Sequence, residues 1–213
     1  MPIFKVAGKL CYFAHVPKCA GTSVEDYLSE RFGQLAFLNR KYNANKAGEF
    51  RTSSPQHILA SDLAGFFPMG FFDHSFAVVR HPIDRVVSAF HYHRDREHNI
   101  KSKVTFKDWV KRLEDFGPKS HQQFDNHFRP QTAFIPKKCR VFKMENGLDK
   151  VEGWLDEIAG GKHIAGIPNH FSGNYKPPRI GTETLERLER MYDSDFDMLR
   201  YKRRAEKAAT AAA

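Results

Sequence analysis

The chain has 213 residues, 41% of them hydrophobic, and its 34 Lys and Arg against 25 Asp and Glu give a formal net charge of +9. This length fits roughly one domain with its own core, the composition excludes general disorder, and the positive charge favours a polyanionic ligand or surface. The three cysteines form no CxxC pair, which disfavours a disulfide scaffold and a Cys-based zinc site and favours a reducing compartment.

The N-terminal segment lacks a long apolar region, and no stretch reaches the ~18 apolar residues of a membrane-spanning helix. The expectation is therefore a cytoplasmic protein without a transmembrane segment. We expect one domain over residues 1–213, of which about 203–213 form a frayed or vector-derived tail.

Three short β-rich runs with nearly continuous apolar character are expected to be strands covered on both faces, as in a parallel sheet. They are residues 10–16, 75–80 and 139–144. Apolar residues at helical spacing then predict helices within 24–32, 83–90, 106–113 and 148–158, and one long helix from about 182 to 199.

This alternation of strands and helices predicts an α/β protein, a three-layer α/β/α fold with a mostly parallel central sheet and ligands at the carboxyl ends of the strands. The stretches 39–56 and 117–137 are polar and are expected to be irregular, substrate-facing loops.

The first predicted strand leads into HVPKCAGTS at residues 15–23 and then into an amphipathic helix. Free backbone N–H groups and the helix dipole at such a start favour an anion. Gly21 allows a close approach of the backbone, Thr22 and Ser23 can donate to phosphate oxygens, and Lys18 is placed to reach charge on a leaving group. The segment is not GxxxxGK[ST], so a nucleoside triphosphatase is not the natural interpretation.

A plain helix cap is the alternative explanation of this segment. Thr22 with Glu25, and Ser23 with Asp26, both approximate a capping box.

The second predicted strand ends in Arg80, and Pro82 opens a helix that carries Ser88. A guanidinium at a strand end and a hydroxyl on the next helix suit a phosphate. Alternatively, Arg80 pairs with an acid such as Asp84, and Ser88 only permits close packing.

Together, HVPKCAGTS at 15–23 and VVRHPIDRVVSAF at 78–90 resemble the paired motifs of sulfotransferases that use 3′-phosphoadenosine 5′-phosphosulfate (PAPS). The resemblance is closest to the branch that contains heparan sulfate 2-O-sulfotransferase, the chondroitin 4-O-sulfotransferases and small bacterial relatives. It extends over about residues 10–201 through weaker segments: HILA at 57–60, HFRPQT at 127–132, VFKMEN at 141–146 and 195–201. Cys19 and Ala20 stand where the family usually has Thr or Ser and Gly or Ala. The family's NxS segment appears one residue longer, from Asn169 to Ser172.

The resemblance implies a P-loop-like phosphosulfate-binding loop and an in-line transfer of the sulfuryl group from PAPS to a hydroxyl. It implies that Lys18 stabilises the leaving phosphate, that His57 is the base, and that Arg80 and Ser88 hold the 3′-phosphate. The expected 5′-phosphosulfate contacts are Lys18, Cys19, Ala20, Gly21, Thr22 and Ser23. In this scheme cationic side chains stabilise the negative charge of the phosphosulfate and the leaving phosphate, so no metal is expected.

A structural, satisfied histidine is the alternative for His57, and His15 and His127 are the next candidates for the base. The histidine-rich run 91–98 matches no tight ligand spacing and is expected to be a solvated helix end rather than a zinc site.

Two other function classes are alternatives to a sulfotransferase. An ATP-dependent kinase would need a magnesium-binding carboxylate after a strand, and Asp73 precedes its strand. A basic nucleic-acid-binding module has only the charge in its favour, and no nucleic-acid partner is expected. The acceptor, a glycan, lipid, small alcohol or phenol, is left open, as are the adenine contacts and the oligomeric state.

Overall fold

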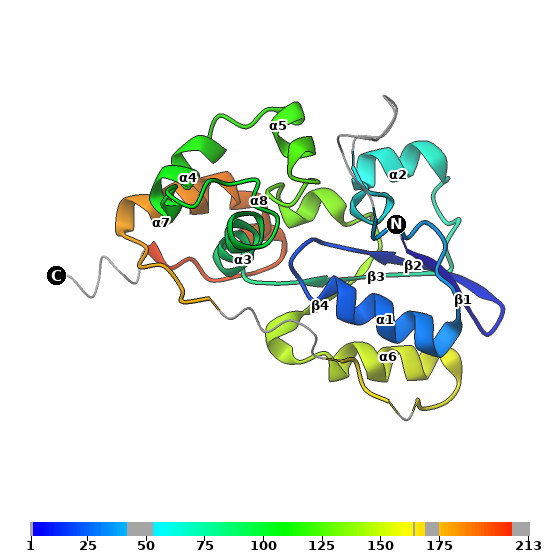
Figure 1. Cartoon of the computed structure of the whole chain (residues 1–213). Helices are drawn as coiled ribbons and strands as arrows, with labels where there is room; N and C mark the ends of the chain where they lie inside the picture. The colour runs from blue at the N-terminus through cyan, green and yellow to red at the C-terminus, as the bar shows by residue number, and fades with distance from the viewer. Residues whose placement is uncertain (1, 42–52, 164, 169–174, 206–213) are drawn as a thin grey trace. The chain divides into compact units, whose positions relative to one another are not determined.

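The computed structural model describes residues 2–41, 53–163, 165–168 and 175–205 (Figure 1). The chain forms two compact units, the first made of residues 1–80 and 133–172 and the second of residues 81–132 and 173–213.

The first unit contains a four-stranded sheet in the order β1-β2-β3-β4. Its strands are β1 (Ile3–Val6), β2 (Lys9–Ala14), β3 (His74–Val79) and β4 (Arg140–Lys143). β2, β3 and β4 are parallel, whereas β1 is antiparallel to β2. The mostly parallel α/β fold and its three predicted strands are confirmed, with ends shifted by one or two residues. β1 is an addition to the predicted sheet.

Helices cover this sheet on both sides. α1 (Gly21–Phe32) and α6 (Asp149–Ala159) lie next to each other on one side, while α2 (Ala60–Phe66) lies on the other (Figure 1). An ion pair of 2.7 Å between Arg31 and Asp156 joins α1 to α6. The indole of Trp154 packs on the rings of Phe76 and Phe142, with centroids 5.2 and 5.8 Å away. Short 3-10 turns η2 (Pro55–His57) and η4 (Met144–Asn146) complete this unit.

The strand register places two predicted loops at one edge of the sheet. Ala14 of β2 pairs with Ala77 of β3, so the segment after β2 and Arg80 after β3 both leave the carboxyl edge. This is the edge at which parallel α/β sheets bind ligands.

The second unit is helical. It contains α3 (Pro82–Asp95), α4 (Phe106–Leu113), α5 (Pro118–Gln123), α7 (Thr182–Met191) and α8 (Asp193–Met198). Apolar side chains of α3, α4 and α7 form its core, together with Phe124 and Phe128. Residues 117–137 are therefore less irregular than expected, since they include α5 and the turn η3 (Gln131–Phe134).

The prediction of one long helix over 182–199 is wrong, because α7 and α8 are separated at Tyr192. This residue leaves helical geometry at φ −112° and ψ 24°, and its hydroxyl donates to the carbonyl of Phe128 at 2.8 Å. The apolar spacing continues through the break, which is why the sequence pattern does not reveal it.

Two buried charged side chains hold the segment 127–132 in the second unit. Arg85, fully buried, donates to the carbonyls of His127 and Arg129 at 2.8 and 2.6 Å. Asp195, also fully buried, accepts from the backbone N–H groups of Gln131 and Thr132 at 2.9 and 3.0 Å. The HFRPQT segment is thereby fixed to α3 and α8.

We expect Arg85→Met to lower the free energy of unfolding by about 3–5 kcal/mol, because it leaves two buried carbonyls without their charged donor. Arg94→Met is the matched control on α3, since the partly exposed Arg94 pairs with the exposed Asp95 and also contacts His91, and it should cost less than about 1 kcal/mol. Urea unfolding of both variants measures the difference. Equal losses would show that Arg85 does not hold the segment.

Candidate functional site

The segment between β2 and α1 is a tight loop with an unusual backbone. Lys18 and Ala20 both adopt positive φ, at 67° and 60°, a region that residues other than glycine seldom occupy. Left-handed residues in alternation with others turn successive N–H groups towards one side and create an anion-binding concavity. Strain of this kind persists where the surroundings enforce it and is typical of functional loops.

Helix α1 begins without a side-chain cap. Its N-cap is Ala20, no side chain bonds to the N-cap position, and its first turn contains no acidic residue. Thr22 and Ser23 lie inside the first turn, so the capping boxes considered as an alternative are not what begins the helix. A helix start of this type favours an anion through its N–H groups and dipole.

The side chains of the loop differ in accessibility. Lys18, Ala20 and Thr22 are partly exposed, whereas Cys19 and Ser23 are buried. The thiol of Cys19 donates to the carbonyl of Pro17 at 3.6 Å. Cys19 is therefore suited to contact a ligand through its backbone rather than its thiol.

His15 joins the two ends of this loop. Its Nδ1 lies 2.5 Å from Oε1 of Glu25 on α1, and its ring lies directly against Gly21. A Cβ at position 21 would come within 1.8 Å of the His15 Nε2. Gly21 and Glu25 are four residues apart and hence on one face of α1. We refer to His15, Gly21 and Glu25 as the loop clamp.

The loop clamp combines a neutral imidazole with an ionised carboxylate. Burial lowers the pKa of His15, although Glu25 opposes this shift. Burial alone would raise the pKa of Glu25, but His15, His57 and Arg40 together lower it. Since a carboxylate can only accept, the His15 proton resides on Nδ1 and is donated to Glu25.

His57, the predicted base, lies in the first unit beside the loop clamp. It ends the turn η2 and is 7% exposed. Its ring meets the His15 ring edge-on, with centroids 4.6 Å apart and planes at 84°. Its Nδ1 lies 3.1 Å from the hydroxyl of Ser54. The structure thus brings His57, His15 and Glu25 together. The sequence pattern indicates only a capping role for Glu25.

Arg80 and Ser88 occupy the positions expected from the motif. Arg80 directly follows β3 and is partly exposed, and Ser88 lies on α3. Ser88 shares the partly exposed stripe of α3 with Asp84, one turn earlier. The guanidinium of Arg204 binds both oxygens of Asp84, at 2.8 and 2.7 Å, so this acid already has a basic partner.

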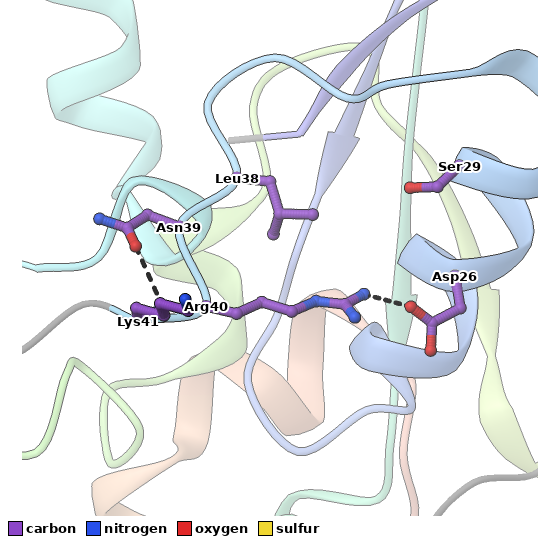
Figure 2. A pocket seen from close by; sticks show the side chains of 6 residues that line it. All are labelled: Asp26, Ser29, Leu38, Asn39, Arg40 and Lys41. Carbon is purple, nitrogen blue, oxygen red and sulfur yellow. Dashed lines mark hydrogen bonds and ion pairs between the residues drawn. The ribbon is translucent and has the colours of Figure 1, made fainter.

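An open pocket of about 470 Å³, lined mostly by residues with polar or charged groups, borders α1. Asp26 and Ser29 of α1 form one wall, and residues 38–41 form the other (Figure 2). Arg40 crosses the pocket to Asp26 and also comes within 3.5 Å of Glu25. Arg40 therefore links this pocket to the loop clamp.

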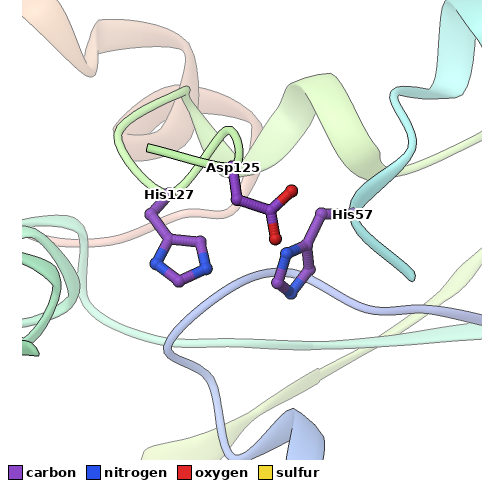
Figure 3. Close-up of side chains that lie close together, drawn as sticks. All are labelled: His57, Asp125 and His127. Atoms are coloured by element: carbon purple, nitrogen blue, oxygen red, sulfur yellow. The ribbon is translucent and has the colours of Figure 1, made fainter. Parts of the chain in front are cut away.

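His127, the other candidate base, belongs to the second unit and follows α5 on the same loop as Asp125 (Figure 3). Its Nδ1 lies 2.9 Å from Nε2 of His93. His91 instead contacts Asp95 at 2.9 Å and stacks on Tyr175. His91 and His93 are both buried within α3, so the prediction of a solvated helix end is wrong for these two histidines, and they contact different partners. Asn169 and Ser172 lie outside the described residues.

We expect Gly21→Ala to destabilise the protein by about 1–3 kcal/mol, because its methyl group would overlap the His15 ring, despite a helix-propensity gain of about 1 kcal/mol. The double variant His15→Ala/Gly21→Ala should lose less stability than the sum of the single variants, since the smaller side chain removes the overlap. Thermal and urea unfolding of all four proteins measure this coupling. Strictly additive losses would refute the packing of His15 on Gly21.

Comparison with known proteins agrees with this geometry. A family model described as "Sulfotransferase family" matches residues 9–170, a range that includes β2, the loop clamp, His57, Arg80 and Ser88. No curated protein and no solved structure gives a match. Because the family model covers more than half of the chain, the chain belongs to the sulfotransferase family.

Proposed function

We propose that the protein transfers the sulfuryl group of PAPS to an acceptor hydroxyl by in-line displacement. The principal support is the loop between β2 and α1, where left-handed residues at 18 and 20 precede an uncapped helix start. The family supplies the chemistry of sulfuryl transfer, and the loop supplies an anion site of the kind that a phosphosulfate requires.

In the proposed step, the acceptor oxygen attacks sulfur while the bond from sulfur to the 5′-phosphate oxygen breaks. The products are the sulfate ester and 3′,5′-diphosphoadenosine, and the hydroxyl proton passes to a base. Backbone groups of residues 18–21 and the hydroxyls of Thr22 and Ser23 hold the 5′-phosphosulfate. Lys18 stabilises the charge that develops on the departing phosphate.

We assign the proton transfer to His57 and a positioning role to His15. His57 lies against the loop clamp without being part of it. His15 has a structural contact on each side of its ring, since its Nδ1 donates to Glu25 and the ring packs on Gly21. A side chain held in this way is better suited to shaping the loop than to meeting a substrate. Protein cations carry the charge in this scheme, which leaves no role for a metal.

We infer a hydroxyl-rich acceptor, most simply a carbohydrate, from the pocket beside α1. Its lining combines a carboxylate, a hydroxyl, an amide and two cations: Asp26, Ser29, Asn39, Arg40 and Lys41, with Leu38. Such alternating donors and acceptors suit several hydroxyl groups. All three cysteines are free thiols, which supports activity in a reducing compartment such as the cytoplasm.

If Arg80 holds the 3′-phosphate, Arg80→Ala should weaken binding of 3′,5′-diphosphoadenosine by about 2–4 kcal/mol, because a charged hydrogen-bond donor is lost. Adenosine 5′-phosphosulfate, which has no 3′-phosphate, should bind nearly unchanged. Calorimetry with both nucleotides measures the two effects.

The matched control is Arg140→Ala. Arg140 begins the neighbouring strand β4, and its guanidinium lies over Trp154 rather than at the carboxyl edge. It should alter neither affinity. Equal losses for the two nucleotides in Arg80→Ala would contradict a 3′-phosphate contact.

Lys18 and His57 should affect different stages of the reaction. Lys18→Ala should lower turnover for every acceptor and also weaken nucleotide binding, because it removes positive charge from the loop. His57→Ala should leave nucleotide affinity nearly intact and lower turnover by roughly 10²–10⁴-fold. An acceptor with an unusually acidic hydroxyl should lose less, since it needs less help in releasing its proton.

His74→Ala is the control, because His74 begins β3 at the opposite, amino edge of the sheet. Steady-state kinetics and nucleotide titration of the three variants are the measurements. A His57→Ala protein that is folded, binds nucleotide and keeps most of its turnover would place the base elsewhere, with His15 and then His127 to be tested.

A further inference from the structure

An exposed aromatic loop lies between α2 and β3. The segment from Phe66 to Phe72 reads FFPMGFF, and three of its apolar side chains are open to solvent. Phe66 is 71% exposed, Met69 78% and Phe71 45%. Contiguous exposed apolar side chains on a folded protein are typical of a surface that binds a protein, a membrane or a ligand.

The aromatic loop is a defined turn rather than a loose connection. The N–H of Phe71 donates to the carbonyl of Pro68 at 3.1 Å, and Gly70 has φ 86°, which together describe a type II turn with Met69 at its tip. Phe72 stacks on Tyr12 of β2 with centroids 5.2 Å apart, and Phe67 packs on Phe72 at 5.1 Å. Phe67 and Phe72 anchor the loop, and Phe66, Met69 and Phe71 are presented outwards.

The aromatic loop lies at the amino edge of the sheet, beside other exposed segments. Asp73 exchanges two hydrogen bonds with Leu10, at 2.7 and 2.9 Å, next to the β1–β2 hairpin. The pairing of Phe76 with Arg140 brings the turn before β4 to the same edge. The exposed charged side chains of α2, the hairpin, this turn and the position just before β3 are Lys5, Lys9, Lys137, Lys138, Asp62 and Asp73. Cations exceed acids here by four to two, as in the chain as a whole, with its net charge of +9.

We propose that this amino edge is a docking surface for an anionic lipid bilayer, with Phe66, Met69 and Phe71 inserted at the interface and the lysines facing the headgroups. Apolar and aromatic tips flanked by lysines are the combination that binds peripheral proteins to acidic membranes. The lysines of this edge are complementary in charge to the anionic headgroups of an acidic leaflet. The sequence gives no corresponding indication of an acidic protein partner. No helix within the described ranges has the length and apolar run needed to span a bilayer, so the contact is one of surface docking.

Flotation of the full chain with lipid vesicles tests the proposal. The protein should float with phosphatidylcholine vesicles that contain phosphatidylglycerol, about tenfold less with pure phosphatidylcholine, and less at high salt. Met69→Asp and Phe66→Ser should each reduce flotation several-fold. Lys9→Glu/Lys138→Glu should reduce it only for the anionic vesicles. In Met69→Trp, the tryptophan emission should shift to the blue when anionic vesicles are added.

Met198→Asp and Phe37→Ser are the matched controls, because Met198 is 72% and Phe37 53% exposed elsewhere on the chain. Neither should change flotation, and melting curves should show that all variants are folded. Absence of flotation, or equal loss in Met69→Asp and Met198→Asp, would overturn the proposal. A wild-type dimer in light scattering that Met69→Asp converts to a monomer would assign the surface to a second copy instead. None of these outcomes depends on the proposed reaction, because no acceptor or nucleotide is present.

Discussion

The contact of His15 with Gly21 and Glu25 is the constraint on which the candidate site depends. A loop with Lys18 and Ala20 in left-handed conformations is unfavourable in isolation, by about 1–3 kcal/mol for each such residue. The imidazole holds the strand end against the first turns of α1 through one hydrogen bond and one close packing contact. We therefore expect the loop geometry to be set during folding, so that a ligand does not have to order the loop when it binds.

The same constraint places a negative charge beneath a site that we propose for an anion. Glu25 is 2% exposed, and a buried carboxylate is tolerated only with partners that offset its desolvation. His15 supplies the hydrogen bond, and the guanidinium of Arg40 supplies positive charge. Arg40 also binds Asp26, so the same guanidinium serves the clamp and the wall of the neighbouring pocket. The conformation of the loop clamp and the charge of the neighbouring pocket are thus linked through the side chain of Arg40.

The sequence predicts those parts of the structure that repeat with a regular period or end a strand. The three parallel strands, α4 and the position of Arg80 follow from apolar spacing. β1 was missed because its signal is only four residues long, although the Ala7–Gly8 turn, with φ 47° and 79°, closes a hairpin. The role of Glu25 was not predictable, because a glutamate three residues after a threonine reads as a cap, and only the tertiary fold turns it towards His15. Tyr192 likewise breaks a helix through a tertiary hydrogen bond that apolar spacing does not encode.

The two edges of the parallel sheet offer different chemistry, and the strands keep them apart. β2 begins at the lysine-bearing hairpin and leads into the loop with left-handed residues, while β3 begins after the aromatic loop and leads into Arg80. A strand of six residues spans roughly 20 Å, well beyond the ~8–10 Å over which exposed charges interact at physiological salt. Lysines at the amino edge consequently contribute little to an anion at the carboxyl edge. We therefore assign these lysines to the proposed bilayer surface and not to the proposed nucleotide site.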